Sequence, residues 1–273
     1  MLAVWAEMFT HVFIQRAFVV GILVSLCASL LDVILVLKRY SLIGDGLSHV
    51  GFGIVSLASA LGLTTPLYVA IPGVALSAIV LLRLNASSHL KSDTAIALIS
   101  SSALALGVAI TSLTPGLNID SHSFMFGSIL AMQQRDVYLS IGVSIAVLTL
   151  FIIYYRKLFL VTFDEDFARA TGLNTTRYTN IIAILTAMVI VIGMRMMGVM
   201  LISSIIIFPA VTAMWWCRSF RATIISAATI GVLSFVIGLY LSYVYNVSTG
   251  ATIILVNLFF FSCSYLLTKI IRS

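Results

Sequence analysis

The chain has 273 residues, of which 61% are hydrophobic and only 9% are charged. A soluble domain is usually about 45–50% apolar and about 25% charged, so this chain has too little polar surface to cover a water-soluble core. The composition excludes a cytosolic enzyme, a secreted disulfide scaffold and a disordered protein. The net charge is +6, but the 15 Lys and Arg residues are scattered along the chain, so we expect no nucleic-acid partner.

Apolar runs long enough to cross a bilayer as helices follow one another along the chain. They lie at about 17–37, 46–63, 67–83, 95–113, 137–155, 178–195, 197–217, 222–244 and 251–268. Residues 195–198 interrupt the stretch 178–217, which is either two spans or one broken unit. The runs are apolar all round and too long for barrel strands. We therefore predict an all-α polytopic membrane protein with about eight or nine transmembrane helices, in a single domain over residues 1–273.

The basic residues predict the orientation of these helices. If the loop that opens with Lys38 and Arg39 is cytoplasmic, twelve of the fifteen basic residues lie on the cytoplasmic side, and the exceptions are Arg16, Arg135 and Arg195. The positive-inside rule then places the N-terminus outside and the C-terminus inside. The first apolar run has no basic region before it and no cleavage site after it, so we interpret it as a first span rather than a signal peptide.

Two connections have distinctive sequences. The outer segment 123–134 is too short to cross the membrane and is interpreted as a surface or re-entrant helix. In the inner segment 156–177, three acidic residues precede Phe167, Ala168 and Ala170, and Gly172 follows them. Acidic residues in a first turn and Gly after a last turn predict a short helix. This helix is either an ordinary connection or a docking element for a soluble partner.

The candidate functional residues lie mainly in SLIGDGLSHVGFGI, where His49 follows Asp45 by four residues. Positions four apart share one face of a helix. On that helix Asp45 and His49 share a stripe about 100° wide with four serines, which are candidates for lining a pathway: Ser41, Ser48, Ser56 and Ser59. Four glycines lie between these polar residues and allow close approach of a neighbouring helix or a passing ion: Gly44, Gly46, Gly51 and Gly53.

A carboxylate and an imidazole at this spacing form half of a site for a divalent first-row metal, since imidazole suits zinc and carboxylate suits manganese. The alternative is a buried Asp–His contact that only orients one helix. Asp32, inside the first span, either lines a pathway or faces a polar neighbour, and His122 is a possible entry ligand or a solvated loop residue. The three cysteines, Cys27, Cys217 and Cys263, occur singly in apolar runs and are interpreted as small buried hydrophobes.

Motifs for catalysis are missing from the sequence. It has no GxxxxGK[ST] loop for a nucleotide, no HExxH and no GxSxG. The chain therefore cannot hydrolyse a nucleotide through a known loop, and we expect any energy to come from a partner.

Five motifs in order resemble one family. SLIGDGLSHVGFG, KSDTAIALISSSALALG, FMFGSILA, FDEDFARATG and MGVMLISSIIIFPAVTA are similar to segments of the permeases of bacterial metal-ion ABC importers, from about residue 15 to 269. The resemblance implies a multi-pass protein of the cytoplasmic membrane, with a fold similar to that of the vitamin B12 and siderophore importers. It also implies a transport subunit that is not an enzyme and that relies on a partner for ATP hydrolysis. The expected assembly is a permease homodimer bound to two copies of an ATP-binding subunit and supplied by an extracellular or periplasmic metal-binding protein.

The same resemblance implies roles for residues of this chain. Asp45 and His49 correspond to the translocation-site ligands, and no cofactor is bound permanently. A cytoplasmic coupling helix is implied at about 163–172, with the ATPase contacts Asp164, Glu165, Phe167, Ala168 and Gly172. Residues 201–213 look more like zinc permeases than manganese ones, so zinc is the expected cargo, with manganese or iron(II) as the alternative. Two other readings remain open, an intramembrane zinc metalloenzyme and a permease for a vitamin or a metal chelate.

Overall fold

A computed structural model describes residues 7–63, 65–87, 92–114, 127 and 134–272. The described residues form ten helices: α2 (Val12–Leu37), α3 (Ile43–Ala60), α4 (Pro66–Ser87), α5 (Ser92–Leu113), α7 (Gln134–Phe163), α8 (Glu165–Ala170), α9 (Thr175–Met197), α10 (Val199–Met214), α11 (Phe220–Tyr245) and α12 (Thr249–Arg272). The predicted all-α fold is confirmed. The predicted outer helix at 123–134 lies outside the described residues, except for Gly127.

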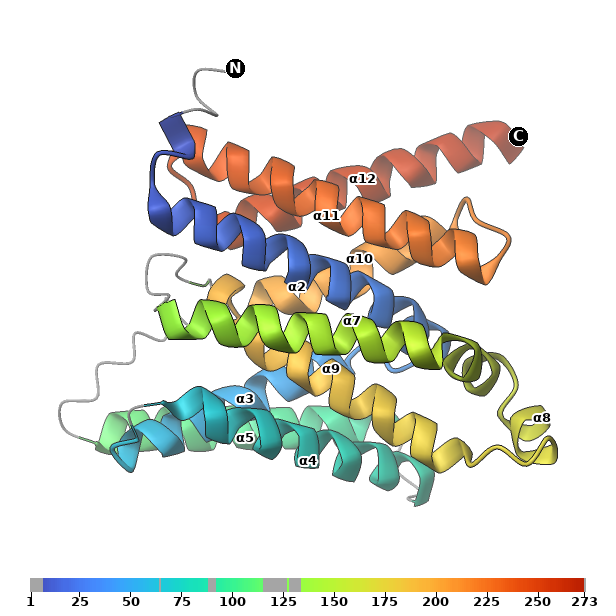
Figure 1. The fold of residues 1–273 in the computed structure, drawn as a ribbon, viewed down its shortest axis with the longest axis horizontal. Coiled ribbons are helices and arrows are strands. Elements are labelled where there is room, and N and C mark those ends of the chain that lie inside the picture. Colours follow the sequence, from blue (N-terminus) through green and yellow to red (C-terminus); the bar gives the residue numbers. More distant parts are fainter. Residues whose placement is uncertain (1–6, 64, 88–91, 115–126, 128–133, 273) are drawn as a thin grey trace.

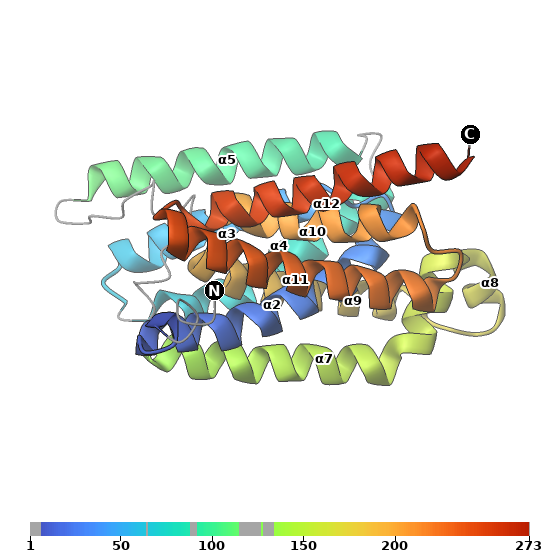
Figure 2. The ribbon, with the colours of Figure 1, turned by 90° about the horizontal axis from the view of Figure 1, so that it is seen from above.

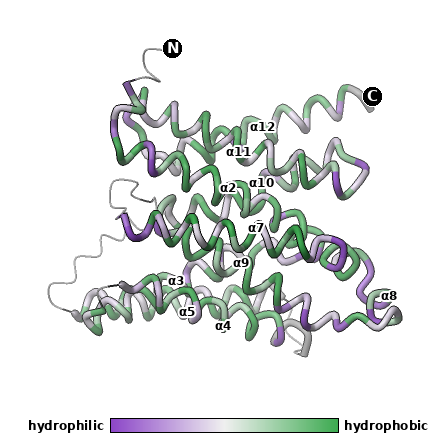
Figure 3. Tube along the Cα trace, viewed as in Figure 1, coloured by the Kyte–Doolittle hydropathy of each residue, from purple (hydrophilic) through white to green (hydrophobic). Residues whose placement is uncertain are grey.

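The long helices run back and forth along a common direction, so that successive connections alternate between two ends of the bundle (Figures 1 and 2). The end that holds the α2–α3 connection also holds α8, the α10–α11 connection and the C-terminus. Hydrophobic residues occupy the middle of the helices and hydrophilic residues gather near their ends (Figure 3). The connections are thus grouped as the predicted topology groups them, and that topology assigns the end that carries α8 to the cytoplasmic side.

Seven of the described helices are long and apolar enough to span a membrane. Counting either α3 or α10 as well gives the expected eight spans, and counting both gives nine. Asp45, His49 and the glycines lower the mean hydropathy of α3, while α10 has 16 residues. At 1.5 Å per residue α10 is about 24 Å long, less than the hydrocarbon core of about 30 Å.

The stretch 178–217 is two helices, because the chain turns back at Gly198. This residue has φ +90°, a conformation that favours glycine, and it separates α9 from α10. Arg195, one of the three basic residues expected outside, lies one turn before this break. Its guanidinium forms an ion pair with Asp136 at the start of α7, with an N–O distance of 3.2 Å. The pair neutralises a cation that the positive-inside rule leaves on the outer side.

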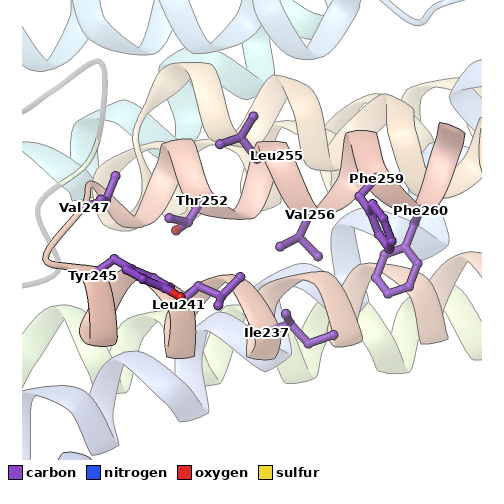
Figure 4. Close-up of a pocket in the computed structure, with 9 residues that line it drawn as sticks. All are labelled: Ile237, Leu241, Tyr245, Val247, Thr252, Leu255, Val256, Phe259 and Phe260. Carbon is purple, nitrogen blue, oxygen red and sulfur yellow. The ribbon is translucent and has the colours of Figure 1, made fainter. Parts of the chain in front are cut away.

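An apolar groove of about 640 Å³ separates the outer parts of α11 and α12 (Figure 4). Its walls include Ile237, Leu241 and Tyr245 on one side and Leu255 and Phe259 on the other. Thr252 supplies a hydroxyl, which donates to the carbonyl oxygen of Gly238 at 2.9 Å. A groove with this lining suits hydrocarbon and offers a metal ion no ligand set.

Candidate metal site

Asp45 and His49 are brought together by the first two turns of α3, as their spacing predicts. The distance from His49 Nε2 to Asp45 Oδ1 is 3.7 Å, and the two side chains are 16% and 49% exposed, respectively. Metal bonds to nitrogen and oxygen are about 2.0–2.2 Å long, so this separation lets both atoms bind one ion. His49 Nδ1 is buried and has no hydrogen-bond partner within the described part of the chain. The pair therefore has the reach of a two-ligand metal site.

Ser203 of α10 is a third polar group at this position. Its hydroxyl lies 3.2 Å from Asp45 Oδ1 and 3.0 Å from the Val199 carbonyl oxygen, and it can donate to either. Ser203 is 158 residues from Asp45 in the sequence, so helical periodicity could not connect them. Its only sequence signal is its place in the MGVMLISS motif. Among the described residues, no group of three or more His, Cys, Asp or Glu side chains is arranged so that it could hold a metal ion.

The predicted serine stripe is only partly present. Ser41 precedes the first residue of α3, so its predicted place on the helix is wrong. Ser48 is fully buried and donates to the Asp45 carbonyl oxygen at 2.7 Å, a bond within its own helix. Ser56 is also fully buried, and its hydroxyl has no hydrogen-bond partner. Ser59 is half-buried. Lining of a pathway by these serines stays a prediction.

The four glycines of α3 allow neighbouring helices to pack closely. A Cβ at Gly46 would lie 2.6 Å from the Ile96 side chain of α5, and one at Gly53 would lie 2.8 Å from the Ala103 carbonyl oxygen. A Cβ at Gly44 would meet Ile206, near the middle of α10. This contact places the start of α3 against the middle of another helix of the bundle. Of the two predicted uses of these glycines, the structure shows helix packing.

Asp32 is fully buried on α2, and neither carboxylate oxygen has a hydrogen-bond partner among the residues that the structure describes. Ser25 and Ser29, on the same face of α2, are also fully buried without partners. The structure does not bring Asp32 together with Asp45 or His49 in any ion pair or hydrogen bond. Cys27 is buried as predicted, whereas Cys217 and Cys263 are only half-buried. His122 lies outside the described residues.

The predicted cytoplasmic helix is present as α8, but it is shorter than expected. Helix α7 continues through Arg156 to Phe163, and α8 covers six residues. The Asp164 carboxylate caps α8 by accepting from the Phe167 backbone N–H at 2.8 Å. Gly172 has φ +80° and ends the helix, as predicted from its position. Phe167 is 55% exposed, whereas the Ala168 side chain is fully buried within this chain and cannot contact a partner.

Glu165 is paired inside the chain. Its carboxylate lies 2.8 Å from Arg169 Nη2 in the same helix and 3.6 Å from Lys38 Nζ at the end of α2. Burial raises the pKa of Glu165, but the Lys38 and Arg169 charges outweigh burial and hold this pKa below its ordinary value. Of the three acidic residues, Asp166 alone has neither a capping bond nor an ion pair among those found in the described residues.

Residues 10–268 match the ABC 3 transport family. The chain belongs to this family. The manganese import system permease protein ScaB of Streptococcus gordonii is 33% identical over 253 residues, which is 93% of this chain and 90% of ScaB. The high-affinity zinc uptake system membrane protein ZnuB of Haemophilus influenzae is 31% identical over 250 residues, which is 91% of this chain and 95% of ZnuB.

Solved structures share the fold of this ABC 3 family chain. A chain of PsaBC from Streptococcus pneumoniae in complex with Fab is 33% identical, with a TM-score of 0.85, over 97% of this chain and 95% of that one. A metal-chelate type ABC transporter in an inward-facing conformation has a TM-score of 0.71 over 96% of this chain and 88% of its own, at 14% identity. The chain is therefore a permease of the metal ABC transporter family and a multi-pass protein of the bacterial cytoplasmic membrane. Permeases of this family work with an ATPase and a substrate-binding protein.

Proposed function

We propose that this chain forms the membrane pathway of an ATP-driven importer for a divalent first-row metal ion, with Asp45 and His49 as ligands of the ion in transit. The observation that carries the proposal is the 3.7 Å approach of an imidazole nitrogen and a carboxylate oxygen inside a helical bundle. Ionisable groups are costly in a membrane and are functional candidates by default. One chain supplies few ligands to the ion, so the ion can be released, which suits a cargo better than a resident cofactor.

Manganese is the leading cargo in this proposal, and zinc is the second candidate. The Asp45 carboxylate and the Ser203 hydroxyl supply hard oxygen donors, which suit manganese, while the His49 imidazole suits zinc as well. Similarity to both ScaB and ZnuB supports metal import without separating the two ions. The preference for zinc drawn from residues 201–213 stays untested.

In the working transporter we expect two copies of this chain, two ATP-binding subunits and an extracellular or periplasmic metal-binding protein. Asp45 is half-exposed in the single chain, so a second copy facing it would complete the ligand set of the ion. Phe167 and Asp166, both exposed on α8, are the side chains we assign to the ATPase contact.

Growth and uptake of a strain that lacks this chain test the proposal. The deletion strain is complemented with the wild-type chain or with an empty vector, and uptake of radioactive Mn²⁺, Zn²⁺ and Fe²⁺ is measured separately under depletion of each metal. We expect the wild-type chain to restore Mn²⁺ uptake at limiting concentration. Restoration of Zn²⁺ uptake alone would reverse the order of the two candidates, and restoration of none would contradict metal import.

A further inference from the structure

The cytoplasmic end of the bundle contains one ion pair that joins two segments with different proposed roles. Lys38 Nζ, at the end of α2, lies 3.6 Å from the Glu165 carboxylate in the first turn of α8. The Lys38 side chain is only 8% exposed, whereas Glu165 is 43% exposed. A buried ammonium depends on its anion, because losing one partner leaves an uncompensated charge away from water. The pair therefore holds α8 against the end of α2.

Glu165 faces the connection from α2 to α3 at more than one residue. Burial lowers the pKa of Lys38, and the Glu165 charge partly opposes this effect. Burial also raises the pKa of Tyr40, and the Glu165 charge raises it further. Two side chains of the connection thus experience the charge of a single residue of α8.

The connection itself is compact and has a fixed backbone. Helix α2 ends with the Tyr40 N–H donating to the Leu35 carbonyl at 2.8 Å and the Arg39 N–H donating to the Val36 carbonyl at 3.1 Å. This pair of bonds is the Schellman arrangement, with Arg39 at φ +60° where glycine is usual. The Ile43 N–H then donates to the Tyr40 carbonyl at 3.0 Å, which begins α3 directly. A displacement of Lys38 therefore shifts the first turn of α3 instead of being absorbed by a slack loop.

That first turn carries Asp45, seven residues after Lys38. On the other side of the pair, α8 follows α7 after a single residue, the N-cap Asp164. The chain thus has a short mechanical route from the exposed α8 to the proposed metal ligand. It runs through one ion pair and one hydrogen-bonded turn.

We propose that the Lys38–Glu165 ion pair transmits movement of α8 to the metal-ligand end of α3, and so couples the ATPase to the metal site. This inference rests on the proposed function, because it takes α8 as the ATPase contact and Asp45 as a metal ligand. Lys38 and Glu165 act as positioning residues and touch neither the ion nor the nucleotide. Their loss lowers the amount of metal moved for each ATP hydrolysed, while assembly of the transporter continues.

The experiment uses the full complex of permease and ATPase in proteoliposomes, with Mn²⁺ as the probe. Transported Mn²⁺ per ATP hydrolysed is measured for wild type, Lys38→Met, Glu165→Gln and the double variant. Met is similar in length to Lys but carries no charge. In Lys38→Met, Glu165 still has Arg169 as an ion-pair partner. We expect each single variant to retain the ATPase on co-purification and to lose at least fivefold in Mn²⁺ per ATP. The double variant should lose no more than either single variant, because residues that act as one pair are not additive.

Two controls separate coupling from folding. Arg169→Gln removes the other cation of Glu165 and leaves Lys38 in place, so its Mn²⁺ per ATP should stay near wild type. Lys38→Arg keeps the charge and should also transport near wild type. Wild-type Mn²⁺ per ATP in both single variants would overturn the inference, as would fully additive losses in the double variant. ATP-driven transport by wild type, measured in the same preparation, tests the proposed function separately.

Discussion

At the scale of single residues, Asp45, His49 and Ser203 show which site residues helical spacing can predict and which it cannot. The spacing of Asp45 and His49 predicts their approach, because residues four apart share a helix face, and the structure confirms it. Ser203 reaches the same carboxylate from another helix, and only the packing of α10 on α3 reveals it. Sequence periodicity therefore finds candidate ligands that share one helix and misses polar groups that the tertiary structure brings from another helix.

Ser203 should tune the affinity of the site. We expect Ser203→Ala to raise the Mn²⁺ concentration for half-maximal uptake about fivefold, because a hydrogen bond of this kind contributes about 1 kcal/mol. Ser203→Thr keeps the hydroxyl and should remain near wild type. Concentration curves of Mn²⁺ uptake measure both, and an unchanged curve for Ser203→Ala would remove Ser203 from the site.

Asp32 should reduce the stability of the fold. Its carboxylate is fully buried without a hydrogen-bond partner, so an ionisable group is held where its charge is costly. We expect Asp32→Asn, which removes the ionisable group at equal size, to raise the unfolding temperature in detergent by about 2–4 °C per kcal/mol gained. A lower unfolding temperature would show that the carboxylate makes a stabilising interaction in the membrane.

At the scale of elements, some side chains of α8 contact the rest of this chain and others are exposed to solvent. Its capping residues follow sequence rules closely, with Asp164 before the helix and Gly172 after it. The assignment of Glu165 and Ala168 to the ATPase could not be judged from the sequence. The first pairs with Lys38, which is 127 residues earlier in the chain, and the second packs inward. In so short a helix, the sequence does not show which side chains face a partner and which pack against the rest of the chain. The folded structure shows it.

Phe167 should anchor the ATPase, since it is a large apolar side chain exposed on a cytoplasmic helix. We expect Phe167→Ala to reduce recovery of the ATPase with tagged permease by tenfold or more, and to leave binding of Mn²⁺ to the permease intact. Leu173→Ala, three residues beyond the helix, is a control of comparable type. Full recovery of the ATPase with Phe167→Ala would place the contact elsewhere, for example at 218–221.

The Lys38–Glu165 link should weaken in acid. The pKa of Glu165 is held below its ordinary value of 4.5, so its contribution to stability is complete above that pH and is lost as the pH falls through the folded-state pKa. We expect wild type to unfold at a higher temperature than Glu165→Gln at pH 6, with the difference shrinking steadily below pH 4.5. A difference that stays constant down to pH 3 would show that the Glu165 charge does not stabilise the fold.

At the scale of the whole molecule, apolar runs and basic residues predict the all-α fold and its alternating helices, because membrane insertion depends on those two quantities. The break at Gly198 stayed ambiguous in the sequence, since the interruption at 195–198 suits one broken span or two. The ion pair between Arg195 and Asp136 could not be predicted from the sequence either, because it joins the ends of two separate helices. Long-range pairs such as this one determine how the membrane-spanning helices pack against one another, and composition does not predict them.

The most direct test of the account is Mn²⁺ uptake by Asp45→Ala and His49→Ala in the complemented deletion strain. His11→Ala serves as the control, because it removes an exposed imidazole at the outer end of α2. We predict that both site variants insert at wild-type levels and lose Mn²⁺ uptake to the level of the empty vector, while His11→Ala keeps it. Removing a polar or charged side chain from a membrane helix should not hinder insertion, because such groups are costly there. Wild-type uptake by either well-expressed site variant would contradict the proposed metal site.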